Sequence, residues 1–194
     1  MDSWEDYVAA VGSALSRVSI TDKRGQSLGT ADGFRRWVEL THDAHRRGQN
    51  IFFVGNGASA AMASHFAADA CKNGGLRAQA FNDAALLTCV GNDLAFDQVF
   101  AQPLARLARA GDMLIAVSSS GASPNIVRAL ERARDMELKI VTVSGKEAGN
   151  PARGFGDVNV YVPSARYGWV ESGHHVILHY WLDQYLGLHG QGAV

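Results

Sequence analysis

The sequence has little of what marks a secreted, membrane-spanning or nucleic-acid-binding protein. It holds 2 cysteines in 194 residues, too few for a disulfide framework and without the spacing of a cysteine metal motif. No apolar run reaches the roughly 18 residues that a membrane-spanning helix needs, and the first residues lack the basic-then-apolar plan of a signal peptide. The formal net charge is -1 at pH 7, whereas nucleic-acid-binding proteins usually carry a basic excess or patch. We therefore expect a cytoplasmic protein that binds neither membrane nor nucleic acid.

The overall composition is that of an ordinary globular protein. Hydrophobic residues make up 47% and charged residues 19% of the chain, which is enough for a sizeable core. No linker, internal repeat or low-complexity tract divides the sequence. We therefore expect one domain over residues 1–194.

Helical and strand-like hydrophobic patterns alternate along the chain. Two amphipathic helices are predicted before any strand, at residues 3–18 and 33–47, and a long helix is predicted near the end, at residues 169–186. Short apolar runs typical of buried strands lie at residues 51–54, 78–81, 113–117, 139–143 and 158–162. Helices are predicted between them at residues 58–72, 84–90, 96–109 and 124–136. This alternation predicts an α/β fold, a three-layer α-β-α sandwich around a central parallel sheet.

The most informative local feature is a hydroxyl-rich turn between a predicted buried strand and a predicted helix. Residues 118–124 read Ser-Ser-Ser-Gly-Ala-Ser-Pro. Ser123 can cap the helix, and Pro124 suits the first helical position because its missing N–H costs nothing there. The start of a helix favours an anion, and the preceding hydroxyls add hydrogen-bond donors. The turn thus predicts a phosphate site, although the same residues also occur in ordinary capped turns.

A glycine-rich turn follows another predicted strand in the same topological place. Residues 55–59 read Gly-Asn-Gly-Ala-Ser. Ligands of α/β proteins bind in crevices at the carboxyl ends of parallel strands. The turn has neither the G-x-G-x-x-G spacing of a dinucleotide site nor the Gly-Lys-Ser/Thr of a P-loop. We expect the two turns to lie at one ligand site, which is neither a dinucleotide site nor a P-loop.

Five motifs, in this order, resemble those of the SIS (sugar isomerase) family, in particular its phosphoheptose isomerases. They lie at residues 54–59, 65–69, 91–93, 118–125 and 162–164, and the resemblance covers about residues 51–185. It implies a SIS fold and the aldose–ketose isomerisation of a heptose phosphate of the sedoheptulose 7-phosphate type. It also implies a homotetramer with active sites at subunit contacts. In this interpretation residues 1–48 form helices used in oligomerisation, and residues 49–194 form the α/β core.

The resemblance also implies the roles of individual residues. Asp69 would be the catalytic base and His179 its acid partner, and zinc would be bound by His65, Asp69, Glu171 and His179. The residues implied to contact the sugar phosphate are Asn56, Gly57, Ala58, Ser59, Asn92, Asp93, Ser118, Ser119, Ser120, Ser123 and Glu171.

Helical spacing leaves one zinc ligand open. His65 and Asp69 are four residues apart and share a helix face. Glu171 and His179 are eight apart, about 12 Å along an ideal helix, which is far for two ligands of one ion. His175 lies halfway between them on the same face and pairs better with either one. The order of the family motifs nevertheless favours His179.

Several positions depart from the family pattern. Asp69 stands where the family has glutamate, Glu171 where it has glutamine, and Ala58 where it usually has glycine, while the connection over residues 72–77 is shorter. These changes keep a second interpretation open, a non-catalytic SIS protein that binds a sugar phosphate or a protein partner, as do relatives that associate with the replication initiator. A sugar-phosphate-sensing regulator is disfavoured, since no residues remain for a DNA-binding helix-turn-helix domain.

Overall fold

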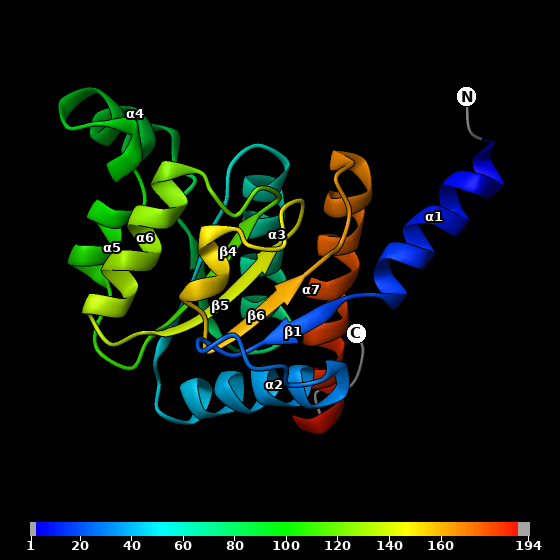
Figure 1. The fold of residues 1–194 in the computed structure, drawn as a ribbon. Helices are drawn as coiled ribbons and strands as arrows, with labels where there is room; N and C mark the ends of the chain where they lie inside the picture. Colours follow the sequence, from blue (N-terminus) through cyan, green and yellow to red (C-terminus); the bar gives the residue numbers. More distant parts are fainter. Residues whose placement is uncertain (1–2, 190–194) are drawn as a thin grey trace.

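A mostly parallel sheet forms the centre of the protein, as a computed structural model of residues 3–189 shows. Its six strands have the order β1-β6-β5-β4-β2-β3, and helices cover both faces (Figure 1). The parallel strands are β2 (Asn50–Val54), β3 (Arg77–Ala80), β4 (Met113–Ser118), β5 (Lys139–Ser144) and β6 (Val158–Tyr161). The predicted three-layer fold is confirmed. Residues 1–2 and 190–194 of the predicted domain lie outside the described residues.

Successive residues of the central strands face opposite cores, because side chains alternate along a strand. Met113, Ile115 and Val117 of β4 belong to one apolar cluster, together with residues of α2 (Thr30–Arg46), α3 (Ala58–Lys72) and α7 (Tyr167–His189). Leu114 and Ala116 belong to the other, together with residues of α4 (Ala84–Asp93), α5 (Ala101–Leu107) and α6 (Pro124–Asp135). The nearly continuous apolar run of β4 is therefore explained by burial on both faces.

A stacked tryptophan pair fixes α7 against α2. The rings of Trp37 and Trp181 lie 5.0 Å apart at 13°, and both side chains are fully buried. Trp181 Nε1 donates to Thr41 Oγ1 at 3.0 Å, and that hydroxyl donates to the Trp37 carbonyl at 2.9 Å. Burial of the two aromatic side chains, together with the hydrogen bond made by the Trp181 N–H, holds α7 in place against α2.

The N-terminal region departs from the predicted pattern. A short strand, β1 (Ser19–Thr21), lies between α1 (Trp4–Ser16) and α2 and pairs antiparallel with β6. The expectation that both helices precede any strand is therefore wrong. Three residues with one buried side chain, Ile20, are too few to produce a readable alternation, and the strand is stabilised by a distant partner.

Two further differences concern helix limits. The helix predicted at residues 96–109 is a 3₁₀ turn, η1 (Phe96–Gln98), followed by α5. A second 3₁₀ turn, η2 (Pro151–Gly154), precedes β6. Within residues 3–189, no helix combines the length and the apolar character needed to cross a membrane.

Candidate functional site

The serine loop (residues 118–123) and the glycine loop (residues 55–59) meet at one edge of the sheet. They follow β4 and β2, which are adjacent parallel strands. Together with the first turn of α7 they enclose a pocket of about 280 Å³, the serine pocket. Its lining residues are Asn56, Gly57, Ala58, Ser59, Ser118, Ser119, Ser120, Ser123, Tyr167 and Glu171. The structure thus brings together all the predicted sugar-phosphate contacts except Asn92 and Asp93.

Two helices begin at the serine pocket. Gly57 precedes α3 and Ser123 precedes α6, and neither residue makes a side-chain capping hydrogen bond. Ser123 takes the N-cap position of α6 and Pro124 begins the helix, as predicted, but the Ser123 side chain makes no capping hydrogen bond. The positive ends of two helix dipoles and several hydroxyls surround one space, which suits a phosphate.

A pair of asparagine amides joins the two loops. Asn56 Nδ2 donates to Asn125 Oδ1 at 2.9 Å, and Asn125 Nδ2 donates back to Asn56 Oδ1 at 2.8 Å. Asn125 is 2% exposed, whereas Asn56 is partly exposed, so water reaches this pair only from the Asn56 side. Sequence reasoning did not give Asn125 a role, although it lies within the 118–125 motif. We infer that it holds Asn56 toward the serine pocket.

A second hollow lies beside the serine pocket, along the groove between α3 and α7. This histidine pocket has a volume of about 660 Å³. Its lining residues are Ala58, Ala61, Met62, His65, Glu171, Ser172, His175 and Val176. Ala58 and Glu171 line both pockets. A ligand with its phosphate among the serines can therefore extend past Glu171 toward the histidines.

Three exposed histidines converge beside the histidine pocket. His65 comes from α3, and His175 and His179 come from α7; one ring nitrogen of each lies within 4.8 Å of the others. The ring centroid of His65 lies 5.6 Å from that of His175 and 5.7 Å from that of His179. The ring centroids of His175 and His179 are 5.0 Å apart. This histidine group could hold a metal ion.

The predicted zinc ligands are only partly brought together. Asp69 Oδ2 lies 3.4 Å from His65 Nε2, and the Asp69 side chain is 28% exposed. His179 belongs to the histidine group, as does His175, which the spacing had left open. Glu171 lies along the groove, between the group and the serines, and is not a member of the group.

Adjacent histidines of α7 have different electrostatic settings. The pKa of His175 is lowered by partial burial and then by the charges of His179 and His65. The pKa of His174, which is fully buried, is lowered to about 4 by burial, an effect that the backbone of Ser144 partly opposes. His174 is therefore neutral at pH 7, and it packs in the core while its neighbour faces the groove.

His174 should make the folded protein less stable in acid. Its pKa is 6.5 in the unfolded chain and about 4 in the folded one, so between these values only the unfolded state binds the proton. Stability falls as the pH drops from 6.5 to 4 and does not depend on this group above 6.5. The full loss is on the order of 3 kcal/mol. Urea unfolding of the protein, freed of metal with a chelator, measures this loss between pH 4 and 6.5.

The matched variants for that measurement are His174→Gln and His45→Gln, since His45 is an exposed histidine of α2. The first should flatten the pH dependence of the unfolding free energy, and the second should leave it as in the wild type. An unchanged slope in His174→Gln would contradict the assignment.

Asn92 and Asp93 lie apart from the serine pocket lining, at the end of α4. Both are exposed, and Asn92 Nδ2 donates to Asp93 Oδ1 at 2.8 Å. Their contact with a sugar phosphate stays a prediction.

Comparisons with known proteins agree with this geometry. The SIS domain family matches residues 6–145. The phosphoheptose isomerase of Geobacter sp. (strain M21) is 36% identical over 148 residues, which cover 73% of this chain and 77% of that protein. The phosphoheptose isomerase of Yersinia pestis (strain Pestoides F) is 36% identical over 141 residues, which cover 70% of this chain and 72% of that protein.

Two solved structures of phosphoheptose isomerases resemble this fold over nearly their whole length. The protein from Francisella tularensis has a TM-score of 0.79 and 25% identity, and the match covers 95% of this chain and 98% of that one. The protein GmhA from Neisseria gonorrhoeae has a TM-score of 0.78 and 29% identity, with 94% and 98% covered.

Proposed function

This chain belongs to the SIS domain family, on its phosphoheptose isomerase branch, and from that membership we propose that it interconverts the ketose and aldose forms of a heptose phosphate. The observation that carries the proposal is that the two pockets are neighbours and share Ala58 and Glu171 as lining residues. A pocket of serines and helix starts, suited to a phosphate, lies on one side of Glu171, and a group of imidazoles with an adjacent carboxylate lies on the other. An isomerase needs both parts of such a site, because one part holds the substrate and the other moves protons.

The serine pocket would hold the phosphate. Hydroxyl groups of Ser119, Ser120 and Ser123 and the first N–H groups of α3 and α6 supply donors, and the positive helix ends favour the dianion. Binding the non-reacting end in this way positions the sugar carbons along the groove. Glu171, between the pockets, faces the sugar hydroxyls.

Asp69 and His179 would move the protons. From ketose to aldose, the Asp69 carboxylate removes a proton from the carbon next to the carbonyl. His179, as a neutral imidazole, donates a proton to the carbonyl oxygen from the ring nitrogen that would not bind the metal, which gives an enediol. Asp69 then returns its proton to the neighbouring carbon, and His179 takes the hydroxyl proton from the first carbon, which leaves the aldehyde. Each group ends in its starting state, and general acid–base steps of this kind contribute about 10²–10⁴-fold each.

The metal would be zinc, for which the family motifs imply His65, Asp69, Glu171 and His179 as ligands. Zinc in such a site supplies a Lewis acid that polarises the carbonyl oxygen. The Asp69 carboxylate lies 3.4 Å from His65 Nε2, where it could also support this histidine as a ligand.

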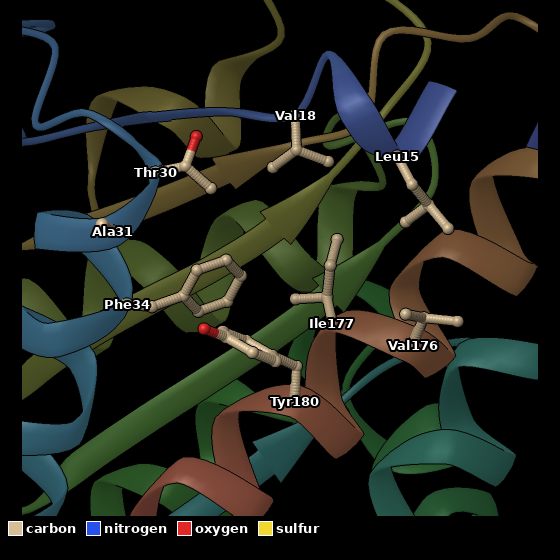
Figure 2. Close-up of a pocket in the computed structure, with 8 residues that line it drawn as sticks. All are labelled: Leu15, Val18, Thr30, Ala31, Phe34, Val176, Ile177 and Tyr180. Carbon is tan, nitrogen blue, oxygen red and sulfur yellow. The ribbon is translucent and has the colours of Figure 1, made fainter. Parts of the chain in front are cut away.

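A homotetramer assembled through residues 1–48, and a cytoplasmic location, complete the proposal. An apolar hollow of about 410 Å³ lies between α1, α2 and α7 (Figure 2), where Phe34 and Tyr180 meet edge to face at 4.8 Å. On α1, which projects from the body (Figure 1), Trp4 is 73% and Val8 50% exposed. Apolar surface of this kind is common where subunits meet.

The second candidate is a non-catalytic SIS protein that binds a sugar phosphate or a protein partner. The observation in its favour is the altered acid set, since Asp69 and Glu171 replace the family's glutamate and glutamine. A binder would need the serine pocket but not the histidine group.

One assay separates the two candidates. The purified protein is incubated with ketose phosphates of five to seven carbons, with and without a chelator, and aldose formation is measured. The proposal expects conversion of the seven-carbon substrate and its loss on chelation. Binding of a substrate without conversion of any would overturn it in favour of the binder.

A further inference from the structure

We propose that His175, in place of Glu171, is the third ligand of the metal site, so that the ion is bound by the three imidazoles of His65, His175 and His179. This deepens the proposed function, on which it rests for the presence of a metal. It differs from the ligand set that the family motifs imply, because His175 is outside that set and because Asp69, which contacts His65, does not bind the ion itself.

The spacing on α7 favours His175. It is one helical turn from His179, a rise of about 6 Å, whereas Glu171 is two turns away, about 12 Å. Two side chains one turn apart reach the same point on a helix face. His65 on α3 faces both histidines, with ring centroids at 5.6 and 5.7 Å.

The nitrogen separations need only small ring rotations to bind one ion. The three donor atoms lie within 4.8 Å of one another. Tetrahedral zinc with Zn–N bonds of about 2.0–2.1 Å places its nitrogens about 3.3 Å apart. A difference of this size is within reach of χ rotations on exposed side chains, without any movement of α3 or α7.

Neighbouring side chains already orient the three rings. Phe66 is fully buried, and its ring packs edge-on against His175 at 5.3 Å and His179 at 4.8 Å. Asp69 contacts His65 at 3.4 Å. A buried aromatic ring packed against the ligands and a carboxylate beside a ligating histidine are features of sites that hold a metal firmly.

This ligand set has consequences for the metal and for Glu171. Three neutral imidazoles with an open position suit Zn²⁺, Co²⁺, Ni²⁺ or Cu²⁺ and bind Mg²⁺ or Ca²⁺ poorly, since those ions prefer oxygen. Glu171 is then released from coordination and stays between the serine and histidine pockets, where its carboxylate can accept hydrogen bonds from sugar hydroxyls.

The test measures metal binding in the absence of substrate. Zn²⁺ affinity is measured by calorimetry, and Co²⁺ is added to read the intensity of its visible absorption, for the wild type, His175→Gln, Glu171→Ala and the control His45→Gln. We expect His175→Gln to lose about 100-fold or more in affinity, since even the loss of an outer partner costs 10–100-fold. Glu171→Ala and His45→Gln should stay within about threefold of the wild type.

Each other outcome overturns the inference. Retained affinity in His175→Gln excludes it as a ligand, and a large loss in Glu171→Ala shows that the acid still coordinates. A wild type that binds no metal also ends it. Thermal unfolding of each variant without metal is the control for folding. An unfolding temperature like that of the wild type shows that an affinity loss is not a folding defect. Because no substrate is present, these results are independent of whether the chain isomerises a heptose phosphate.

Discussion

Replacing Asp69 with asparagine is expected to lower kcat by about 10²–10⁴-fold, the usual contribution of a general base. An amide has nearly the shape of the carboxylate but cannot accept the proton from carbon. The serine pocket is untouched, so the KM for the sugar phosphate should change by no more than a few-fold. Steady-state kinetics on the seven-carbon ketose phosphate, at saturating zinc, gives both constants.

The matched variants separate a base from a metal support. Asp69→Glu restores the residue type of the family and should keep most of the activity, whereas Asp135→Asn, at the exposed end of α6, should behave as the wild type. A loss of only a few-fold in Asp69→Asn would refute its role as base. A loss of kcat that appears at limiting zinc and disappears at saturating zinc would instead assign Asp69 to supporting His65 as a metal ligand.

Much of the fold could be predicted because its central elements have strong local signals. The apolar run of β4, the turn that follows it and the proline at the start of α6 each specify a boundary, and all three lie where the sequence indicates. β1 could not be predicted, since three residues that pair with β6 across 140 positions of sequence have no local pattern. The break between η1 and α5 was missed because both segments continue one helical periodicity.

The site was predictable where it follows from topology and less so where it depends on side-chain direction. Loops after adjacent parallel strands must meet, so the serine pocket followed from the order of elements. The choice between His175 and Glu171 depends on which side of the groove each ring or carboxylate occupies, which spacing alone leaves open. Asn125 was missed because its amide partner, Asn56, is 69 residues away.

A stability series on three glycines tests whether the serine loop is held rigidly in its phosphate-binding shape. Gly121 has φ +60°, and an added Cβ there would overlap the side-chain amide of Asn150. Gly57 has a positive φ of 56° but open space around it, and Gly149 has open space without a positive φ. The three positions therefore separate backbone strain from steric overlap.

Gly121→Ala is expected to lower the unfolding free energy by about 3 kcal/mol, of which 1–2 come from the left-handed backbone and the rest from overpacking. Asn150 cannot move aside easily, because its Nδ2 donates to the Glu147 carbonyl at 2.8 Å and to Ser144 Oγ at 3.2 Å. Gly57→Ala should cost only the backbone part, and Gly149→Ala less than about 0.5 kcal/mol. Urea unfolding measures all three.

The same variant should also weaken phosphate binding by at least about tenfold, since displacements near 1 Å are enough to disrupt a positioned site. The Gly121 N–H donates to the Ser118 carbonyl and hydroxyl, both at 3.1 Å, so any shift of residue 121 moves the serine hydroxyls. The inhibition constant of inorganic phosphate against the sugar phosphate measures this effect. Because it is measured well below the unfolding temperature, it is separate from the effect on stability. A folded Gly121→Ala protein with wild-type phosphate affinity would mean that the ligand is held elsewhere than in the serine loop.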